Sequence, residues 1–442
     1  MKTYLVHGLA RSGMACVEFL LKSGCLVYVL DSDLAKMGQA SQKGAHIWEN
    51  QDMSMLTAVI QSPGIPLTHP LVKQARDRQV RIMGDVDLFR ETYPKAKIIG
   101  ITGTNGKSTT TTLIGHILTE CGVPVAVGGN VGVPALSLSP LPNDGVYVLE
   151  LSSYQLDLSA CLSLDYAVWM NITPDHLERH GSMEDYVYAK MKIFAGKGNP
   201  PQSMISIDDA YSLQVYDEMN EAHPGFLTPV SVNRPLLGGI FVLDDLLVDA
   251  TGDERLVVGD LSGLDRLKGR HNYQNIAMAY GICRAYGLAP DAIMRGVETF
   301  PGLAHRQEVV RILGNVTFIN DSKATNADAT SHALSAFDTI YWIVGGVAKS
   351  DGIDELLPLL NRVKKAYLIG ESATNFAKVL EGRVDYVSCG DMDTAITRAY
   401  ADASLLGGTV LLSPACASFD QYRDFEHRGD VFRDCVQQLV VE

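Results

Sequence analysis

The chain has 442 residues, 46% of them apolar, and a formal net charge of −14 at pH 7. A chain of this length exceeds what one hydrophobic core organises, so two or three domains are expected. The net acidity argues against a nucleic-acid-binding surface, but it leaves room for small anionic substrates, which need only local cations.

Neither a membrane segment nor a disulfide framework is indicated. No apolar run is long enough to span a bilayer, and the run at residues 3–7 is too short for a signal peptide. The eight cysteines include no C-x-x-C pair, so no zinc site is indicated either. The sequence is typical of a cytoplasmic protein with reduced thiols, and a monomer is the expected state.

Strand and helix patterns alternate through the first ninety or so residues. Short apolar runs predict strands at 4–7, 26–30 and 58–60, and helical periodicity predicts helices at 12–22 and 71–79. This order predicts a mostly parallel sheet, as in a Rossmann-like domain covering residues 1–92. Residues 91–95, which include Pro94, are predicted to be a linker.

A second unit is predicted for residues 93–298. Its expected strands are 96–99, 147–151 and 167–170, and its expected helices are 110–120, 184–195 and 272–286. Residues 238–258 show short β-like runs separated by polar turns, which predicts antiparallel hairpins added to a parallel sheet.

A third alternating unit is predicted for residues 299–442. Its strands are expected at 316–320, 340–344, 366–369, 386–388 and 409–412. The predicted fold class is therefore α/β with three domains: a Rossmann-like domain, a central domain of the P-loop ATPase type, and a second Rossmann-like domain.

Residues 100–109 read Gly-Ile-Thr-Gly-Thr-Asn-Gly-Lys-Ser-Thr, between a predicted strand and a predicted helix. A glycine-rich turn followed by Gly-Lys-Ser predicts a phosphate-binding loop, although Ile101 stands where the strict pattern has glycine. Lys107 can reach terminal phosphates, and Ser108 can offer its hydroxyl to Mg²⁺. An ordinary strand-to-helix turn is the alternative, but it does not require Lys-Ser.

Residues 8–13 read Gly-Leu-Ala-Arg-Ser-Gly and open a helix after the first strand. With Asp31 at the end of the second strand, they resemble a dinucleotide-binding fingerprint with Ala10 at the second glycine. A nicotinamide site, a site for the diphosphate of another nucleotide, and a turn without ligand all stay open, and we favour the second.

Three residues downstream of the phosphate loop are candidate ligands or catalytic groups. Glu150 lies in an otherwise apolar strand, where a carboxylate is costly to bury without a partner such as Mg²⁺. An edge-strand acid facing solvent is the alternative. His176 follows a strand, which by itself is weak support for a role, and the spacing around Lys190 favours a solvated helix face.

The motifs together resemble the Mur ligases and the related folylpolyglutamate synthases. Residues 102–108 match the superfamily's phosphate loop. Residues 320–326, Asn-Asp-Ser-Lys-Ala-Thr-Asn, and residues 412–421, Leu-Ser-Pro-Ala-Cys-Ala-Ser-Phe-Asp-Gln, are similar to the branch that adds D-glutamate. The Asp-Asn-Pro-Arg motif of the diaminopimelate-adding ligases is absent.

The resemblance implies that ATP phosphorylates the carboxylate of UDP-N-acetylmuramoyl-L-alanine, and that the amine of D-glutamate attacks the acyl phosphate. It implies catalytic roles for Lys107, Glu150, His176, Lys190 and Lys323. It also implies two Mg²⁺ sites, where Mn²⁺ can substitute, held by Ser108, Glu150, His176 and a carbamylated Lys190. Neighbouring Lys192 is the alternative site of carbamylation.

The resemblance also implies binding residues. For ATP they are Gly103, Thr104, Asn105, Gly106, Lys107, Ser108, Thr109, Asn275, Arg306 and Asp321. For the uridine nucleotide they are Leu9, Ala10, Arg11, Ser12, Asp31, Ser62, Pro63, Gly64 and Asn130. For D-glutamate they are Thr325, Lys349, Ser418, the Phe419 backbone and Phe425, and ATP is expected in a cleft that domain closure completes.

Other functions stay open at this point. A related amide ligase that adds a different amino acid would explain the phosphate loop but not residues 412–421. A nicotinamide oxidoreductase leaves Lys107 and Glu150 unexplained, and a non-catalytic nucleotide-binding module leaves the catalytic residue types unexplained. One version of the family carries Thr and Arg after the first-domain acid, where this chain has Ser32 and Asp33, so the detailed uracil contacts are not predicted.

Overall fold

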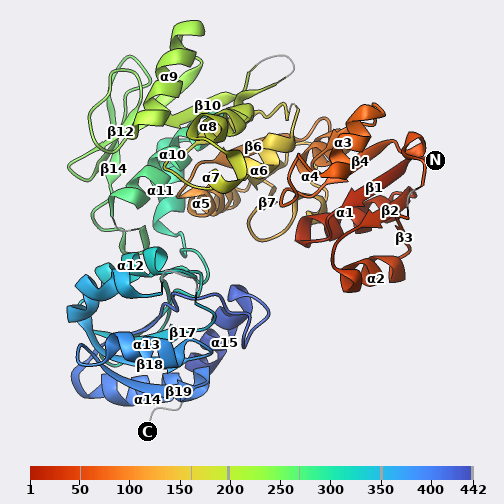
Figure 1. Cartoon of the computed structure of the whole chain (residues 1–442). Coiled ribbons are helices and arrows are strands. Elements are labelled where there is room, and N and C mark those ends of the chain that lie inside the picture. The colour runs from red at the N-terminus through yellow and green to blue at the C-terminus, as the bar shows by residue number, and fades with distance from the viewer. Residues whose placement is uncertain (50, 161, 197–199, 268, 349–351, 440–442) are drawn as a thin grey trace. The chain divides into compact units, whose positions relative to one another are not determined.

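The computed structural model describes the chain except for residues 50, 161, 197–199, 268, 349–351 and 440–442. It divides into two compact units, Met1–Pro301 and Gly302–Glu442. In Figure 1 the first unit runs from red through yellow to green, and the second runs from turquoise to dark blue. Among the described residues, no helix combines the length and the apolar character needed to cross a bilayer.

The first sheet is wholly parallel, with strand order β3-β2-β1-β4-β5. Its strands are β1 (Thr3–His7), β2 (Leu26–Leu30), β3 (His46–Ile47), β4 (Ala58–Gln61) and β5 (Ile82–Met83). The helices are α1 (Arg11–Lys22), α2 (Leu34–Gln42), α3 (Pro70–Asp77) and α4 (Asp85–Thr92), with a 3-10 turn at Met53–Met55. Helix α1 buries Cys16, Val17 and Leu20, the spacing of an amphipathic helix on a sheet. The predicted strands and helices of this region are confirmed to within two residues.

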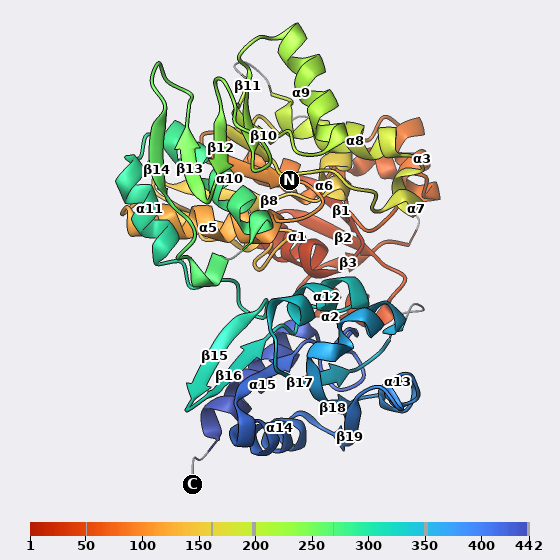
Figure 2. The same cartoon turned by 90° about the vertical axis from the view of Figure 1, so that its left-hand side faces the viewer.

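The second sheet has nine strands in the order β14-β13-β12-β11-β10-β9-β6-β8-β7. They are β6 (Lys97–Thr102), β7 (Val125–Gly129), β8 (Val146–Glu150), β9 (Tyr166–Trp169), β10 (Gln202–Ser206), β11 (Leu227–Ser231), β12 (Ile240–Leu243), β13 (Leu246–Asp249) and β14 (Leu256–Asp260). The strands from β7 to β12 are parallel, and β12, β13 and β14 form the predicted antiparallel hairpins. Figure 2 shows these last three strands side by side.

Helices pack on both faces of the second sheet. They are α5 (Lys107–Glu120), α6 (Ser153–Leu158), α7 (Leu177–His180), α8 (Met183–Met191), α9 (Ala210–Ala222), α10 (Arg270–Tyr286) and α11 (Pro290–Glu298), with 3-10 turns at Ala135–Ser137, Lys192–Phe194 and Asp265–Leu267. One apolar cluster joins α5, α10 and α11 to strand residues such as Ile99 and Val148. A second cluster joins Leu149 and Trp169 of the opposite face to α6 and α8. Helix α5 begins three residues before its predicted start, so Lys107 and Ser108 are helical.

The predicted linker at residues 91–95 is wrong in part. Helix α4 continues through Thr92, so within 91–95 only residues 93–95 lie outside a helix or strand, and β6 begins at Lys97. Phe89 and Tyr93 pack their rings against Tyr147 of the second sheet, with centroids 4.9 and 5.9 Å away. The same apolar cluster therefore spans both sheets, which is why they form one compact unit.

The second unit contains a six-stranded sheet with the order β15-β16-β20-β17-β18-β19. Its strands are β15 (Glu308–Leu313), β16 (Val316–Asn320), β17 (Ile340–Gly345), β18 (Val363–Ile369), β19 (Asp385–Gly390) and β20 (Gly408–Leu412). All five predicted strands are present, and only β15 is antiparallel to its neighbour. The helices are α12 (Ala327–Ala336), α13 (Ala373–Leu380), α14 (Met392–Leu406) and α15 (Phe425–Gln438), with a 3-10 helix at Asp354–Arg362.

The sheet of the second unit has an apolar cluster on each face. Leu334, Leu356 and Phe376 belong to one cluster, and Ile396 and Phe432 to the other. A parallel sheet covered by helices on both faces is the predicted α/β architecture. The predicted domain boundaries at 92/93 and 298/299 stay predictions.

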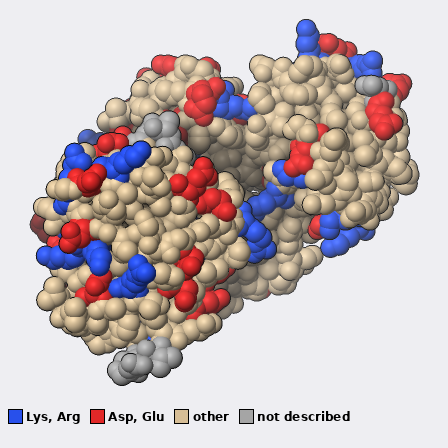
Figure 3. Space-filling view, turned by 60° about the horizontal axis from the view of Figure 1, so that its bottom comes forward, with Lys and Arg blue, Asp and Glu red and all other residues tan. Residues whose placement is uncertain are grey.

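On the face shown in Figure 3, acidic and basic side chains are scattered among uncharged residues. The net charge of −14 therefore does not form one acidic field on that face.

Candidate active site

The phosphate-binding loop connects β6 to α5. Its backbone has positive φ at Gly103 (147°) and at Gly106 (83°). Gly106 is the N-cap of α5, and no side chain caps the helix there. A Cβ atom at Gly106 would lie 2.4 Å from Oδ1 of Asn275, and one at Gly103 would lie 2.6 Å from Cβ of Met170. The loop therefore requires both glycines and presents an uncapped helix N-terminus, which favours an anion.

Replacing Gly106 by alanine is expected to weaken ATP binding by at least about tenfold, because the added Cβ strains the left-handed backbone and pushes on Asn275. Calorimetric titration with a non-hydrolysable ATP analogue measures this. Gly122→Ala is the matched control, since Gly122 also has positive φ (74°) but has nothing within 4 Å of its added Cβ. Equal affinities of the two variants would contradict the assignment of the loop.

Asn171, directly after β9, shapes the loop from the neighbouring strand. Its side-chain Oδ1 accepts from the N–H of Asn105 (2.8 Å), and its Nδ2 donates to the carbonyl of Asn105 (3.1 Å). Its own carbonyl accepts from the N–H of Thr104 (2.8 Å). The sequence analysis assigned Asn171 no role, although its position after a strand adjacent to β6 was a usable signal. The predicted ATP contact Asn275 lies buried beneath Gly106, where its Oδ1 accepts from Thr110 (3.2 Å).

Glu150 ends strand β8 beside the start of α5. It is buried, and its Oε2 accepts a hydrogen bond of 2.7 Å from the Ser108 hydroxyl. Its Oε1 accepts one of 2.8 Å from the side-chain amide of Asn130. Among the described residues no cation lies within ion-pair distance of Glu150: its carboxylate accepts from two neutral donors, and Lys190 interacts with it only through space. A carboxylate and a hydroxyl at this distance are the hard oxygen ligands that Mg²⁺ prefers, so these residues fit the predicted metal.

Lys107 and Lys190 both donate hydrogen bonds to backbone carbonyls of the phosphate-binding loop. Lys107 Nζ donates to the carbonyls of Gly103 (3.0 Å) and Thr104 (2.7 Å). Lys190 Nζ donates to the same Gly103 carbonyl (2.7 Å) and to Thr102 Oγ1 (3.3 Å). The solvated position that spacing favoured for Lys190 is wrong, because α8 turns this residue into the core, where it is 1% exposed.

The surroundings of Lys190 disfavour the charged form of its amine. Burial first, and then the nearby charge of Lys107, lower the pKa of Lys190 well below its ordinary value. Its Nζ lies 4.9 Å from the ring centre of Tyr186. Lys192 differs, since its Nζ pairs with the Asp157 carboxylate (3.2 Å) away from the loop.

His176 lies at the N-cap of α7 with a φ of 55°, an uncommon conformation for a residue other than glycine. Its Nδ1 is 3.0 Å from the hydroxyl of Tyr154. The guanidinium of Arg179 lies over the Tyr154 ring (5.3 Å) and donates to the carbonyl of Ile65 (3.0 Å). Tyr154 and Arg179, neither of which the sequence analysis named, thus connect His176 to the turn that contains the predicted nucleotide contacts 62–64.

The predicted uridine-nucleotide residues lie at the carboxyl ends of β1, β2 and β4, except Asn130, which follows β7 of the second sheet. The carboxylate of Asp31 accepts from the backbone N–H groups of Leu9 and of Asp33 (2.9 Å). Burial pushes the pKa of Asp31 upward, but these donors outweigh it and the pKa lies below its ordinary value. Asp31 therefore shapes residues 8–13, and Arg11 donates to the carbonyl of Gly132 beside Asn130.

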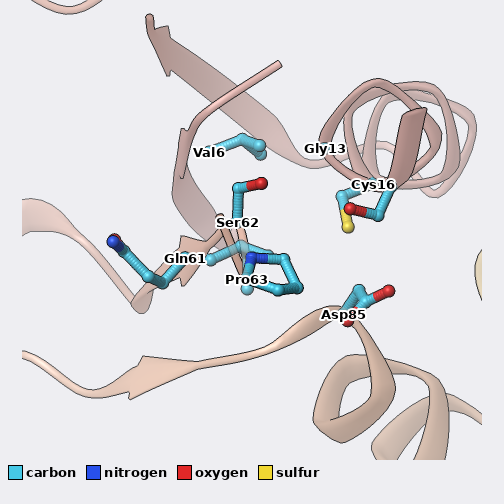
Figure 4. A pocket seen from close by; sticks show the side chains of 9 residues that line it. Val6, Gly13, Cys16, Gln61, Ser62, Pro63 and Asp85 are labelled. Atoms are coloured by element: carbon cyan, nitrogen blue, oxygen red, sulfur yellow. The ribbon is translucent and has the colours of Figure 1, made fainter. Parts of the chain in front are cut away.

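A small cavity lies beside the turn that contains Ser62 and Pro63 (Figure 4). Ser62 and Pro63 line it with Cys16 and Asp85. The buried carboxylate of Asp85 accepts from the Gln155 amide (3.1 Å) of helix α6. Next to the cavity, Asp85 at the start of α4 therefore makes a polar contact with helix α6, which follows Glu150.

The remaining predicted residues belong to the second unit: Arg306 precedes β15, Asp321, Lys323 and Thr325 follow β16, Lys349 follows β17 in the chain, and Ser418, Phe419 and Phe425 follow β20. Asp321 is buried and accepts from the N–H of Gln307 (3.1 Å) and the hydroxyl of Ser413 (2.7 Å), and burial raises its pKa to about 7. Lys323 Nζ lies 5.9 Å from the ring centre of Phe425. Ser418 is buried, whereas Arg306 and Phe419 are exposed. Thr325 is half-buried, and Lys349 lies outside the described residues.

Within the described part of the chain, no three His, Cys, Asp or Glu side chains are grouped to hold a metal ion. A metal beside the phosphate loop would therefore depend on the oxygen atoms of Ser108 and Glu150, on an imidazole nitrogen of His176, and on whatever donor atom a modified Lys190 would bring.

Family models match all three parts of the chain. They are described as Mur ligase MurD-like, N-terminal domain (residues 2–84), Mur ligase middle domain (101–283), and Mur ligase, glutamate ligase domain (305–416). Among solved structures, the UDP-N-acetylmuramate-alanine ligase MurC of Thermotoga maritima aligns with a TM-score of 0.60 at 18% identity, covering 99% of each chain. MurF of Acinetobacter baumannii aligns with a TM-score of 0.62 at 16% identity, covering 94% of this chain and 91% of its own.

The chain belongs to the Mur ligase family, as its phosphate loop and its α/β architecture already indicated. Its similar curated relatives include proteins named UDP-N-acetylmuramoylalanine–D-glutamate ligase. The one from Phenylobacterium zucineum is 46% identical over 99% of this chain and 97% of the relative. The one from Caulobacter vibrioides is 45% identical (99% and 96%), and the one from Rhodospirillum rubrum 44% (98% and 94%).

Proposed function

We propose that the protein is an ATP-dependent ligase that joins D-glutamate to UDP-N-acetylmuramoyl-L-alanine in the synthesis of peptidoglycan precursors. The observation that carries the proposal is the 2.7 Å pair of Ser108 and Glu150 beside the uncapped N-terminus of α5. The similarity to relatives of that name over nearly the whole chain supports the choice of substrates.

The reaction proceeds in two steps. The carboxylate of the nucleotide-linked alanine attacks the γ-phosphorus of ATP, which forms an acyl phosphate and releases ADP. The amine of D-glutamate then attacks the acyl carbon, and the tetrahedral intermediate collapses to an amide, phosphate and a proton. Phosphorylation is needed because a free carboxylate is a poor electrophile.

The residues of the phosphate loop bind and orient ATP. Backbone N–H groups at the start of α5 point toward the phosphates, and Lys107 exchanges its carbonyl partners for phosphate oxygens. Thr104, Asn105 and Thr109 complete this loop. In this proposal Asn130, whose amide donates to Glu150, contacts the phosphates and the muramoyl substrate.

Mg²⁺ would be held by Ser108 and Glu150 at one site and by His176 and Lys190 at a second, and Mn²⁺ can replace it because it also takes oxygen ligands. When bound, the metal neutralises charge on the phosphate oxygens. We further propose that Lys190 is carbamylated, since its amine is buried beside Lys107 with no carboxylate of the described residues at ion-pair distance, Asp175 and Glu150 acting on it only through space, and a carbamate would supply an oxygen ligand.

The second unit supplies the acceptor residues. Thr325, Lys349, Ser418, the Phe419 backbone and Phe425 bind D-glutamate, whose two carboxylates need cations and donors. Arg306, Asp321 and Lys323 contact ATP, with Lys323 at the γ-phosphate. In the first unit, residues 9–12, Asp31 and residues 62–64 hold the uridine diphosphate. We also propose a monomer that works on small molecules in the cytoplasm.

The proposal is tested by phosphate release with ATP, Mg²⁺ and UDP-N-acetylmuramoyl-L-alanine, comparing D-glutamate with L-glutamate, L-lysine and L-alanine. Release that depends on D-glutamate alone is the expected result. Release with a different amino acid would keep the ligase chemistry and reject the acceptor. No release with any of them would reject the proposal, and bound dinucleotide would then be the next test.

A further inference from the structure

Arg428 is a buried charged side chain of the second unit to which the proposed chemistry gives no role. It lies in the first turn of α15 and is 1% exposed. No carboxylate among the described residues lies within ion-pair distance of its guanidinium. Burial lowers its pKa to about 10, so the group is still charged at neutral pH. Asp420 is the carboxylate that acts on it through space, and a buried cation without a directly paired anion is costly, so its presence requires an explanation.

The guanidinium of Arg428 bonds two loops. Its Nε donates to the Ser322 hydroxyl (2.9 Å), and its Nη2 donates to the Ser322 carbonyl (2.8 Å) and to the Cys416 carbonyl (3.0 Å). Ser322 in turn donates to the Phe425 carbonyl (2.8 Å). One side chain thus joins the loop after β16 to the loop after β20 and to the start of α15.

A third loop lies against the same group. An added Cβ at Gly346, just after β17, would come within 3.3 Å of Arg428 Nη1 and 2.3 Å of the Ala417 carbonyl. Nη1 itself is buried without a hydrogen-bond partner among the described residues. Strands β16, β20 and β17 are adjacent and parallel, so Arg428 lies where three neighbouring strands end. Ligands of open α/β sheets bind at that edge.

We infer that Arg428 is a positioning residue of the acceptor pocket: it holds the three strand-end loops in register and gives the pocket a buried positive charge that favours a dicarboxylate. This inference rests on the proposed function, because Thr325, Ser418 and Phe425 lie on the elements that Arg428 joins. Neutral carbonyls compensate its charge only in part, and a ligand with two carboxylates adds the missing anionic field. The residue acts through the loops, since Nη1 is enclosed.

The test compares Arg428→Met, which removes the charge at similar volume, with Arg428→Lys, which keeps it. The KM for D-glutamate is expected to rise about tenfold in R428M, while the KM values for ATP and for the uridine nucleotide stay within about twofold. The preference for D-glutamate over D-glutamine, whose side chain is neutral, should fall about tenfold in R428M and be retained in R428K. Thermal unfolding followed by circular dichroism shows whether each variant is folded.

Arg383→Met is the matched control, because Arg383 also donates to a backbone carbonyl in this unit (Val379, 2.6 Å) but is exposed in the turn that follows α13. An unchanged KM for D-glutamate in R428M, a parallel rise in all three KM values, or an unchanged acceptor preference would overturn the inference. If R428M does not fold, an unchanged KM for D-glutamate in R428K, which loses the multiple hydrogen bonds of the guanidinium, would overturn it. If the proposed function itself is wrong, the wild-type protein will show no D-glutamate-dependent phosphate release. This result differs from a failure of the inference about Arg428, in which the wild type is active.

Discussion

Replacing Glu150 by alanine is expected to lower ATP-dependent phosphate release by at least about a hundredfold and to leave binding of the uridine nucleotide unchanged. The carboxylate is the charged oxygen ligand nearest to Ser108, and without it the metal at the phosphate loop loses its anionic partner. Phosphate release in the coupled assay and calorimetric titration with UDP-N-acetylmuramoyl-L-alanine measure the two quantities.

Glu150→Gln separates charge from packing. Glutamine has the size of glutamate and keeps an oxygen to accept from Asn130, so this variant is expected to melt close to the wild type. It should nevertheless lose phosphate release about as strongly as the alanine variant, because an amide carries no charge. Full activity of E150Q, or equal loss of ligation and of uridine-nucleotide binding in folded E150A, would contradict the assignment of Glu150 as a metal ligand.

Lys190→Ala is expected to lose at least about a hundredfold of the activity, since it removes the proposed carbamate ligand from beneath the phosphate loop. Lys192→Ala is the matched control. Lys192 is two residues away and pairs with Asp157, so its loss should change activity by no more than about threefold.

A direct measurement of the modification does not depend on turnover. With ¹³C-labelled bicarbonate, a carbamate carbon resonance is expected in the wild type and in K192A but not in K190A. Only the neutral amine attacks CO₂, and the pKa of Lys190 lies well below its ordinary value, so the signal should be present at neutral pH and decrease as the pH is lowered. A resonance that persists in K190A, or a fully active K190A, would refute the carbamate.

Much of the fold follows from local patterns. Apolar runs predicted β2 and β16 with their observed bounds, and the glycine-rich turn predicted a loop that requires Gly103 and Gly106. These predictions succeed because strand burial and backbone conformation depend on neighbouring residues. The prediction of a linker at 91–95 was wrong in part because Pro94 was interpreted as a break between domains, whereas Tyr93 packs on Tyr147 of the next sheet.

The site was only partly predictable. Glu150 was found from its place in an apolar strand, since a carboxylate there needs a partner. Lys190 was not found from its spacing, and only the resemblance to the Mur ligases pointed to it. Asn171 and Arg428 were missed, because their partners are distant in the chain: Asn105 lies 66 residues from Asn171, and Ser322 lies 106 residues from Arg428.

The sequence by itself determined the α/β class, the phosphate loop and the family, because each of these is encoded in short runs of residues. Only the tertiary structure decided that Lys190 faces the loop, that Tyr154 and Arg179 join His176 to the first sheet, and that Arg428 is buried where three strands end. The physical reason is that burial and hydrogen-bond partners arise when parallel strands are brought side by side, and their order in a sheet is not their order in the chain.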